Sequence, residues 1–190
     1  MKCTTIMIYF ENLTIIIVTY KSDKIIYNFI KKIPKKINVI VVENSNNIKL
    51  KENIEKKFLN TKVYLRKNKG VGTSLNYGVS KTKTKYFIHL SPDLDLNYKD
   101  IKHFFYYAIQ LNNNFCALGP RFLNTKKKGH IQIDKKLKFG KIDSIHGSYM
   151  FFNKKRFEEI GGWDENIFLF FEETEFCYRA KTKKTYFVIK

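Results

Sequence analysis

The segment with the clearest capacity for chemistry is residues 91–96, Ser-Pro-Asp-Leu-Asp-Leu, which carries two carboxylates two positions apart. It follows the apolar run 85–90, which predicts a buried strand. Because side chains alternate along an extended chain, Asp93 and Asp95 can point the same way. Such a pair suits a divalent cation, which prefers oxygen ligands and can also hold substrate phosphates. The alternative is a polar turn, since Asp and Pro are common turn residues.

A second acidic cluster, Glu172, Glu173 and Glu175, lies among phenylalanines at the start of a helix that we expect over 168–180. Glu172 and Glu173 are about 100° apart around a helix, so only one of them can face a given site. A carboxylate beside aromatic rings can have a raised pKa, which suits a general base. Acidic residues favoured by the helix dipole are the alternative. Glu175 and Arg179 have the spacing of a surface ion pair.

Residues 68–72, Asn-Lys-Gly-Val-Gly, form a glycine-rich turn that opens a helix. Such turns can accept a phosphate at the helix N-terminus. Leu75 stands where a dinucleotide fingerprint requires a third glycine, and no Gly-Lys-Ser/Thr sequence of a phosphate loop follows. The glycines alone therefore favour a tight turn with close helix packing. His89, within an apolar strand, is expected to be a core residue.

The elements that must position these groups can be read from hydrophobic periodicity. Strands are predicted over 13–18, 37–42, 62–66 and 85–90, and helices over 23–32, 48–59 and 71–79. This alternation indicates an α/β layer with a mostly parallel sheet. Ligands of such sheets bind beyond the carboxyl ends of the strands. We therefore expect 19–20, 43–44 and 93–95 to meet at one edge.

The second half of the chain is less regular. Ile101, Phe104, Phe105, Ala108 and Ile109 are expected on the inner face of a helix. The predicted elements are helices over 97–111 and 154–160, strands over 115–122 and 148–152, an irregular strand over 131–139, a basic loop over 124–129 and an apolar run over 185–189. Gly161-Gly162 is a helix-stop signal.

Length and composition set broader limits. A chain of 190 residues is expected to form one domain. Its formal charge of +19 fits a nucleic acid, an anionic membrane or an anionic substrate, and lysines spread along the whole chain also fit codon bias. No nucleic-acid motif is present, which disfavours that partner. Three widely spaced cysteines, no apolar run of about 20 residues and no signal peptide predict a cytoplasmic protein.

Several short motifs follow one another in a characteristic order. They are Ile-Val-Thr-Tyr at 17–20, Val-Val-Glu-Asn-Ser at 41–45, the turn at 68–72 followed by Asn-Tyr-Gly at 76–78, the acidic segment at 91–95, His-Gly-Ser at 146–148, Gly-Gly-Trp-Asp-Glu at 161–165 and the stretch 171–180. In this order they resemble family-2 glycosyltransferases of the GT-A fold, especially the rhamnosyltransferase-like branch. The resemblance runs from Leu13 to about Lys190.

The resemblance implies a role for each matching residue. Nucleotide-sugar contacts would come from Thr19, Tyr20, Glu43, Asn44, Asn68, Gly70, Asn76 and Asp93. Acceptor contacts would come from Gly147, Ser148, Trp163 and Asp164. Asp93, with Asp95 nearby, would hold Mg²⁺ or Mn²⁺. Glu172 and Glu173 would form the catalytic pair, with Glu173 as general base. Glu43 and Glu173 both stand where the family usually has Asp.

The implied activity is an inverting transfer of a sugar from a UDP- or dTDP-sugar to a glycan or lipid-linked acceptor, as in polysaccharide biosynthesis of the cell envelope. One catalytic domain over 1–190 would comprise a nucleotide-sugar-binding half, 13–96, and an acceptor-side half, 97–190. Family members usually continue further, so the resemblance also implies a shortened chain. A member that binds the donor without turnover is the main alternative. The positive charge would allow peripheral contact with the anionic inner face of the membrane.

Overall fold

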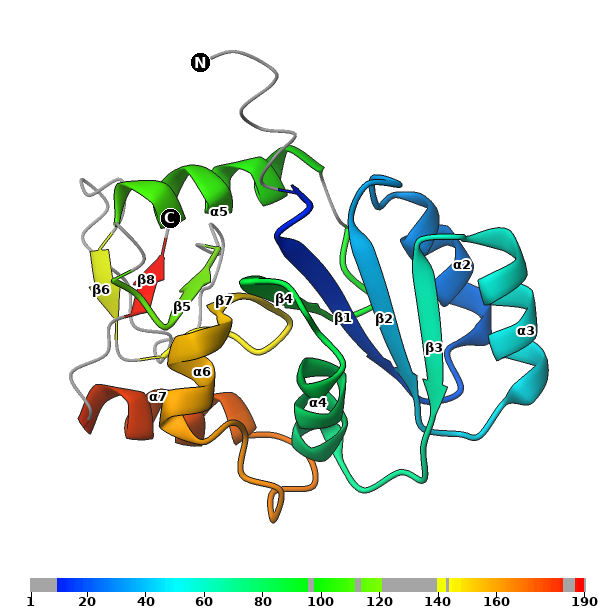
Figure 1. Cartoon of the computed structure of the whole chain (residues 1–190). Helices are drawn as coiled ribbons and strands as arrows, with labels where there is room; N and C mark the ends of the chain where they lie inside the picture. The colour runs from blue at the N-terminus through cyan, green and yellow to red at the C-terminus, as the bar shows by residue number, and fades with distance from the viewer. Residues whose placement is uncertain are drawn as a thin grey trace.

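The computed structural model of the chain describes residues 10–95, 98–111, 114–120, 140–142, 144–182 and 187–189. Strands and helices alternate through the first half, as the sequence predicts (Figure 1). The strands are β1 Leu13–Thr19, β2 Asn38–Glu43, β3 Thr61–Leu65, β4 Tyr86–Leu90, β5 Ala117–Gly119, β6 Gly140–Ile142, β7 Tyr149–Asn153 and β8 Phe187–Ile189. The helices are α2 Asp23–Lys31, α3 Ile48–Lys57, α4 Val71–Ser80, α5 Tyr98–Gln110, α6 Lys154–Ile160 and α7 Glu172–Thr182.

The strands form one mixed sheet in the order β3-β2-β1-β4-β7-β5-β8-β6. Its first four strands are parallel, because β1 pairs in parallel with both β2 and β4, and β2 with β3. Beyond β4 the sheet changes direction, since β7 runs antiparallel to both β4 and β5. The β8 strand is parallel to β5 and antiparallel to β6. The predicted parallel layer is therefore confirmed for the first half, and the second half adds the antiparallel strands.

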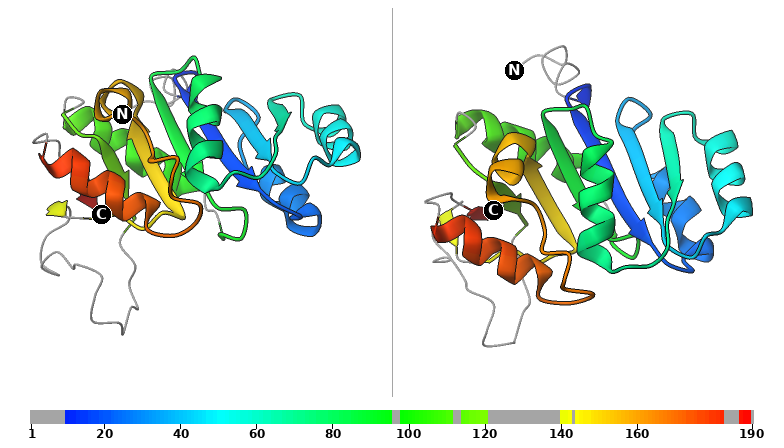
Figure 2. Two further views of the ribbon diagram at one scale, coloured as in Figure 1. Left: turned by 90° about the horizontal axis from the view of Figure 1, so that it is seen from below. Right: turned by 60° about the horizontal axis from the view of Figure 1, so that its bottom comes forward.

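Both faces of the sheet are covered by helices (Figures 1 and 2). Residues of α2, α3 and α5 pack on one face together with Ile15 and Ile17, while α4, α6 and α7 pack on the other together with Ile16. Alternate side chains of β1 thus enter opposite cores. This two-sided burial explains why β1 is a continuous run of apolar residues.

The polar strand ends meet at one edge of the sheet, as expected. Thr19 lies opposite Glu43 in the β1–β2 register, and β4 lies on the other side of β1. Because β7 runs antiparallel to β4, its first residue, Tyr149, lies beside Leu90, the last residue of β4. The loop before β7 therefore joins the loops that follow β1, β2 and β4.

The structure corrects several expectations about the second half. Helix α7 begins at Glu172, so residues 168–171 are an exposed loop and not a first helical turn. Phe170 and Phe171 have φ angles of 66° and 67°, which a right-handed helix does not allow. Ile109 is exposed on α5, because it lies outside the stripe that faces the core.

Other boundaries differ less. The predicted strand over 115–122 is the shorter β5, and its last two residues lie outside the described part of the chain, as do the expected loop at 124–129 and the irregular strand at 131–139. Helix α6 ends at Ile160 and is capped by Gly161, whose φ of 100° confirms the stop signal. Among the helices that the structure describes, none is long and apolar enough to cross a membrane.

Candidate active site

The acidic segment after β4 is a turn in which the two carboxylates are held differently. The amide of Leu94 donates a hydrogen bond to the carbonyl oxygen of Ser91 at 3.3 Å, so the alternation of extended chain does not apply here. Asp95 Oδ1 lies 2.8 Å from the ammonium of Lys32, beside the end of α2. This hydrogen bond and positive charge lower the pKa of the Asp95 carboxyl. Asp93 is exposed and is the more available of the two carboxylates.

The corner between β4, β7 and α7 brings three predicted segments together. The amide of Ser91 donates to the carbonyl oxygen of Ser148 at 2.9 Å, which fixes the acidic turn against the loop before β7. A Cβ atom placed on Gly147 would lie 3.4 Å from Cδ and 3.5 Å from Oε2 of Glu173. The Glu173 carboxylate therefore lies against the backbone at Gly147, one residue from the contact with Ser91.

The side chains of Glu172 and Glu173 lie in different environments, as the angle of about 100° between neighbouring helical residues predicts. Within the described residues, Glu172 Oε2 is buried and has no hydrogen-bond partner. Burial raises the pKa of the Glu172 carboxyl, and the charge of Glu173 adds to the rise. Ser148, in contrast, has its hydroxyl 2.8 Å from Nδ1 of the exposed His146. Of the pair, Glu173 is the residue that borders the predicted acceptor floor.

Glu43, the last residue of β2, supports the loop that follows the strand. Glu43 is 0% exposed, and its carboxylate accepts hydrogen bonds from the amide of Ser45 at 2.9 Å and from the amide of Asn47 at 2.7 Å. The Ser45 hydroxyl also donates to it. Both carboxylate oxygens therefore accept hydrogen bonds within the loop, and the contact with the base or ribose that the resemblance implies stays a prediction. Glu43 thus acts as an internal acceptor that shapes the turn into α3.

Asn44 is also held internally. Its side-chain amide donates to Ser74 Oγ at 2.8 Å, and the same hydroxyl is 3.0 Å from Asn44 Oδ1, which joins the end of β2 to α4. The amide of Asn44 donates to the carbonyl oxygen of Thr19 at 2.9 Å. Thr19 Oγ1 is buried and has no partner in the described part of the chain, whereas Tyr20 is half exposed. Sequence reasoning missed Ser74, because no motif marks a single helical serine.

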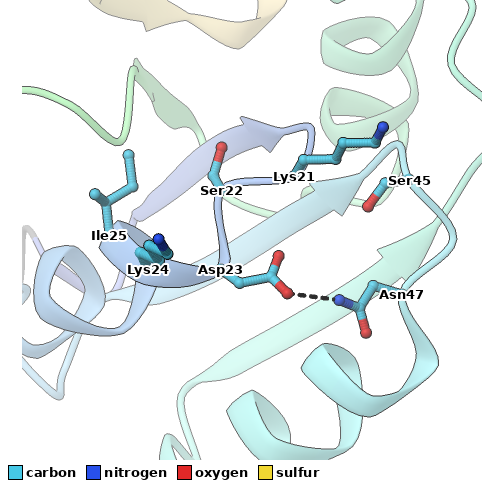
Figure 3. Close-up of a pocket in the computed structure, with 7 residues that line it drawn as sticks. All are labelled: Lys21, Ser22, Asp23, Lys24, Ile25, Ser45 and Asn47. Atoms are coloured by element: carbon cyan, nitrogen blue, oxygen red, sulfur yellow. Dashed lines mark hydrogen bonds between the residues drawn. The ribbon is translucent and has the colours of Figure 1, made fainter.

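A pocket of about 570 Å³ opens beside these strand ends (Figure 3). Its lining comes from the loop after β1, the first turn of α2 and the loop after β2: Lys21, Ser22, Asp23, Lys24, Ile25, Ser45 and Asn47. A hydrogen bond of 2.8 Å from Asn47 Nδ2 to Asp23 Oδ2 joins its two sides. None of the lining residues was predicted, but Tyr20 and Asn44 immediately precede Lys21 and Ser45.

The glycine-rich turn is a packing device, which confirms the interpretation that the glycines favoured. Gly70 has a φ of 103°, and a Cβ atom there would lie 2.5 Å from the backbone oxygen of Phe168. The amide of Val71, the first residue of α4, donates to that same oxygen at 3.1 Å. The first amide of this helix N-terminus is therefore already paired with the protein backbone. The side chain of Asn68 accepts from the amide of Gly70 at 3.2 Å and supports the turn.

Residues 161–165 are tied to α4 by Asn76. Its side-chain amide donates to the carbonyl oxygen of Trp163 at 2.9 Å, and its Oδ1 accepts from the amide of Trp163 at 2.9 Å. Trp163 is only 3% exposed and packs against Phe152, Phe157 and Phe176, and this burial argues against the acceptor contact that the resemblance implies. The rings that bury Trp163 come from β7, α6 and α7, which the motif at 161–165 does not reveal.

Asp164 and Arg179 also hold the loop in place. Asp164 Oδ1 accepts from the backbone and side-chain amides of Asn166, each at 2.9 Å, and these bonds lower the pKa of the Asp164 carboxyl. The predicted pair of Arg179 and Glu175 is present, but it is more than a surface pair. Arg179 also donates to the carbonyl oxygens of Ile160 at 2.9 Å and Gly162 at 2.7 Å, which fastens α7 to the end of α6.

Comparison with known proteins decides the family. The family model described as Glycosyl transferase family 2 matches residues 14–169. The chain belongs to glycosyl transferase family 2. The resemblance predicted from the ordered motifs is thereby confirmed, and the matched range includes the turn after β4 and the loop before β7.

Two curated relatives cover most of this chain. The low-salt glycan biosynthesis hexosyltransferase Agl10 of Haloferax volcanii is 28% identical over 192 residues, which cover 90% of this chain and 62% of that protein. The dTDP-rhamnosyl transferase RfbF of Shigella flexneri is 28% identical over 192 residues, with coverage of 90% and 63%. The family-2 chain described here thus spans somewhat less than two thirds of the length of these relatives.

Solved structures show the same fold. TarS residues 1–349 from S. aureus, in complex with UDP, gives a TM-score of 0.73 at 15% identity and covers 94% of this chain and 57% of that one. The mannosyltransferase PcManGT from Pyrobaculum calidifontis, in complex with GDP-Man and Mn²⁺, gives 0.68 at 12% identity, with coverage of 94% and 56%. These likenesses confirm the predicted GT-A fold.

Proposed function

We propose that this family-2 chain transfers a sugar from a nucleotide-diphosphate donor to a hydroxyl of an acceptor, with inversion at the anomeric carbon. The observation that carries the proposal is the position of Glu173 against Gly147, at the corner where Ser91 and Ser148 join. A carboxylate in this corner supports the proposal, because ligands of parallel sheets bind beyond the carboxyl ends of the strands. UDP and GDP-Man in the structures with the same fold support a nucleotide-sugar donor.

In this proposal, Glu173 takes the proton from the acceptor hydroxyl as its oxygen attacks the anomeric carbon. A new C–O bond forms, and the bond from that carbon to the diphosphate oxygen breaks on the opposite face. The nucleoside diphosphate leaves with the electron pair, and the proton stays on Glu173. Gly147 borders this carboxylate closely, since a Cβ atom placed there would be in ordinary van der Waals contact with it.

A divalent metal fits the acidic turn, with Asp93 as its protein ligand. Mg²⁺ is commonly bound by one or two carboxylates together with substrate phosphates. Asp93 is exposed at the sheet edge, whereas Asp95 is paired with Lys32. Within the described residues, no group of three or more His, Cys, Asp or Glu side chains could hold a metal without substrate. Such a metal would neutralise the charge of the departing diphosphate.

The nucleoside would lie on the β1–β2 side of the same edge. Tyr20 is exposed there, and the pocket next to it has Lys21 and Lys24 among its lining residues. Aromatic and cationic side chains suit a nucleobase and an anionic phosphate. We place the donor along this edge, with its sugar toward Glu173.

The proposal extends to the acceptor and its setting. The names of the relatives, a glycan biosynthesis hexosyltransferase and a rhamnosyl transferase, support a glycan or lipid-linked acceptor in cell-envelope polysaccharide synthesis. The charge of +19 supports peripheral contact with an anionic membrane face. Liposome sedimentation that does not depend on anionic lipid would contradict the membrane contact.

Thermal unfolding in the presence of UDP- and dTDP-sugars tests the donor proposal. A donor that binds only the folded state raises the melting temperature by mass action. We expect such a rise with Mn²⁺ present and a much smaller one for Asp93→Ala. If no nucleotide sugar changes the melting temperature, with or without metal, the proposal is wrong.

A further inference from the structure

The loop of residues 168–171, Phe-Leu-Phe-Phe, displays apolar side chains that the proposed reaction does not yet use. Their exposed fractions are 56%, 47%, 69% and 74% in chain order. By contrast, Trp163 and Phe176, which flank this loop in sequence, are buried. A run of exposed large apolar residues usually marks a surface that binds something.

The loop is held in its exposed conformation at both ends. At the start, the backbone oxygen of Phe168 accepts from the amide of Val71, and the backbone packs on Gly70. At the end, the oxygen of Phe171 accepts from the amide of Glu175 at 2.9 Å. Between these anchors, Phe170 and Phe171 both have positive φ angles, which bulky residues rarely adopt. Strained backbone of this kind is concentrated at functional sites.

The anchors also place the loop beside the reaction. Its first residue contacts the N-terminus of α4, and its last residue immediately precedes Glu172 and the proposed base Glu173. Figure 2 shows the segment that leads into α7 passing the end of α4. The apolar surface therefore lies at the rim of the corner where the acceptor hydroxyl must arrive.

The charges next to the loop indicate what kind of ligand it suits. Asp164 and Glu165 precede it, and Glu172 and Glu173 follow it. Arg179, the nearest cation on α7, is already paired with Glu175. Lys69, exposed beside Gly70 at the start of the loop, is outnumbered by these four carboxylates. The excess of acidic groups disfavours an anionic lipid surface at this loop, despite the positive net charge of the chain. An uncharged sugar ring meets no such repulsion.

We propose that Phe170 and Phe171 form a platform for a neutral sugar ring of the acceptor. Aromatic faces carry partial negative charge and attract the C–H face of a sugar, while its hydroxyls point outward. Stacking on the platform would bring one hydroxyl toward Glu173. This inference rests on the proposed transferase function and adds the acceptor class and two acceptor-binding residues.

The test compares Phe170→Ala and Phe171→Ala with Tyr106→Ala, which removes an exposed ring on α5, on the other face of the sheet. Methyl glycosides of glucose, mannose and rhamnose serve as neutral acceptor probes. Release of nucleoside diphosphate from UDP- and dTDP-sugars gives KM for each glycoside, and saturation-transfer NMR reports contact with its C–H protons. The melting-temperature shift caused by the donor is measured in parallel.

We expect each loop variant to raise the KM of the stimulating glycoside by about three- to tenfold. The kcat at saturation and the donor-induced shift should be unchanged. Phe170→Trp should have a KM close to that of the wild type, and Tyr106→Ala should leave the KM unchanged. A merely structural loop would change the melting temperature and kcat instead.

Three results would overturn the platform while leaving the transferase proposal intact. The first is an unchanged KM in both loop variants, and the second is no saturation transfer to any glycoside. The third is that the wild type binds vesicles of neutral phosphatidylcholine and the loop variants do not, which would make the loop a membrane contact. Absence of any donor-induced shift would instead contradict the proposed function itself.

Discussion

Two groups of polar residues lie along the same edge of the sheet, and they are used in opposite ways. At the ends of β1 and β2, Glu43 and Asn44 are buried and hydrogen-bonded within the protein. At the corner of β4, β7 and α7, Asp93 is exposed and Glu173 lies against a glycine. The comparison indicates that a carboxylate at this edge is taken up by the scaffold when its own loop supplies donors, and stays available when it does not.

The largest expected effect is on kcat and comes from a substitution at the corner of β4, β7 and α7. Glu173→Gln keeps the shape of the side chain but cannot accept the proton from the acceptor. We expect a loss of about 10²–10⁴-fold in kcat, the usual contribution of a general base, with a normal donor-induced thermal shift. Glu158→Gln, on the exposed side of α6, is the matched control and should keep the full rate. Equal rates for both variants would place the base elsewhere.

The next largest effect concerns the acidic turn, where replacing Asp93 and replacing Asp95 should lower kcat by different amounts. Asp93→Asn should lower kcat by about 10²-fold, because it removes the proposed protein ligand of a charge-neutralising metal. Asp95→Asn breaks an exposed pair with Lys32 and should have a much smaller effect. The rates of both variants are measured across a range of Mn²⁺ concentrations. A greater dependence on Asp95 would show that the turn rearranges to release it from Lys32.

At the ends of β1 and β2, we expect substitutions to lower the stability of the fold before they lower the rate of turnover. Glu43→Ala leaves the amides of Ser45 and Asn47 without their buried acceptor. We expect a loss of about 3 kcal/mol in the free energy of unfolding, measured with urea. Glu43→Gln keeps one acceptor oxygen and should lose less. If Glu43→Ala were fully stable but failed to bind donor, the nucleotide contact implied by the resemblance would be correct after all.

The smallest effect concerns Glu172, whose folded-state pKa is raised above its ordinary value near 4.5. Below that value the carboxyl is protonated in both states, and burial costs nothing. As the pH rises through the folded pKa, the unfolded chain gains more from ionisation, so the wild type loses stability. Glu172→Gln should therefore become more stable relative to wild type as the pH rises above about 4 in urea unfolding. A relative gain toward low pH would contradict the burial.

Most of the fold follows from the sequence, because hydrophobic periodicity reflects burial directly. The β-branched runs gave β1 and β2, and the order of the strands in the first half placed their polar ends at one edge. The separation of Glu172 and Glu173 also followed, since helix geometry fixes their angle. The proximity of Glu173 to Gly147 agrees with the predicted roles of these two residues, which remain predictions.

The features that the sequence did not reveal arise from contacts that are distant or irregular. Trp163 is buried by rings of β7, α6 and α7, which no local pattern reveals. The carboxylate of Glu43 is engaged by a turn whose backbone amides carry no sequence signature. Residues 168–171 look helical by composition, but their chain reverses to reach α4.

The anomeric configuration of the first product tests the central claim most directly. Proton NMR of a reaction with UDP- or dTDP-sugar, Mn²⁺ and a glycoside that stimulates turnover reports the H1–H2 coupling of the transferred sugar before any equilibration. An attack assisted by Glu173 on the face opposite the diphosphate predicts the opposite anomer to that of the donor, and no such signal from Glu173→Gln. A product that retains the configuration of the donor would contradict the role given to Glu173 and to the corner it occupies.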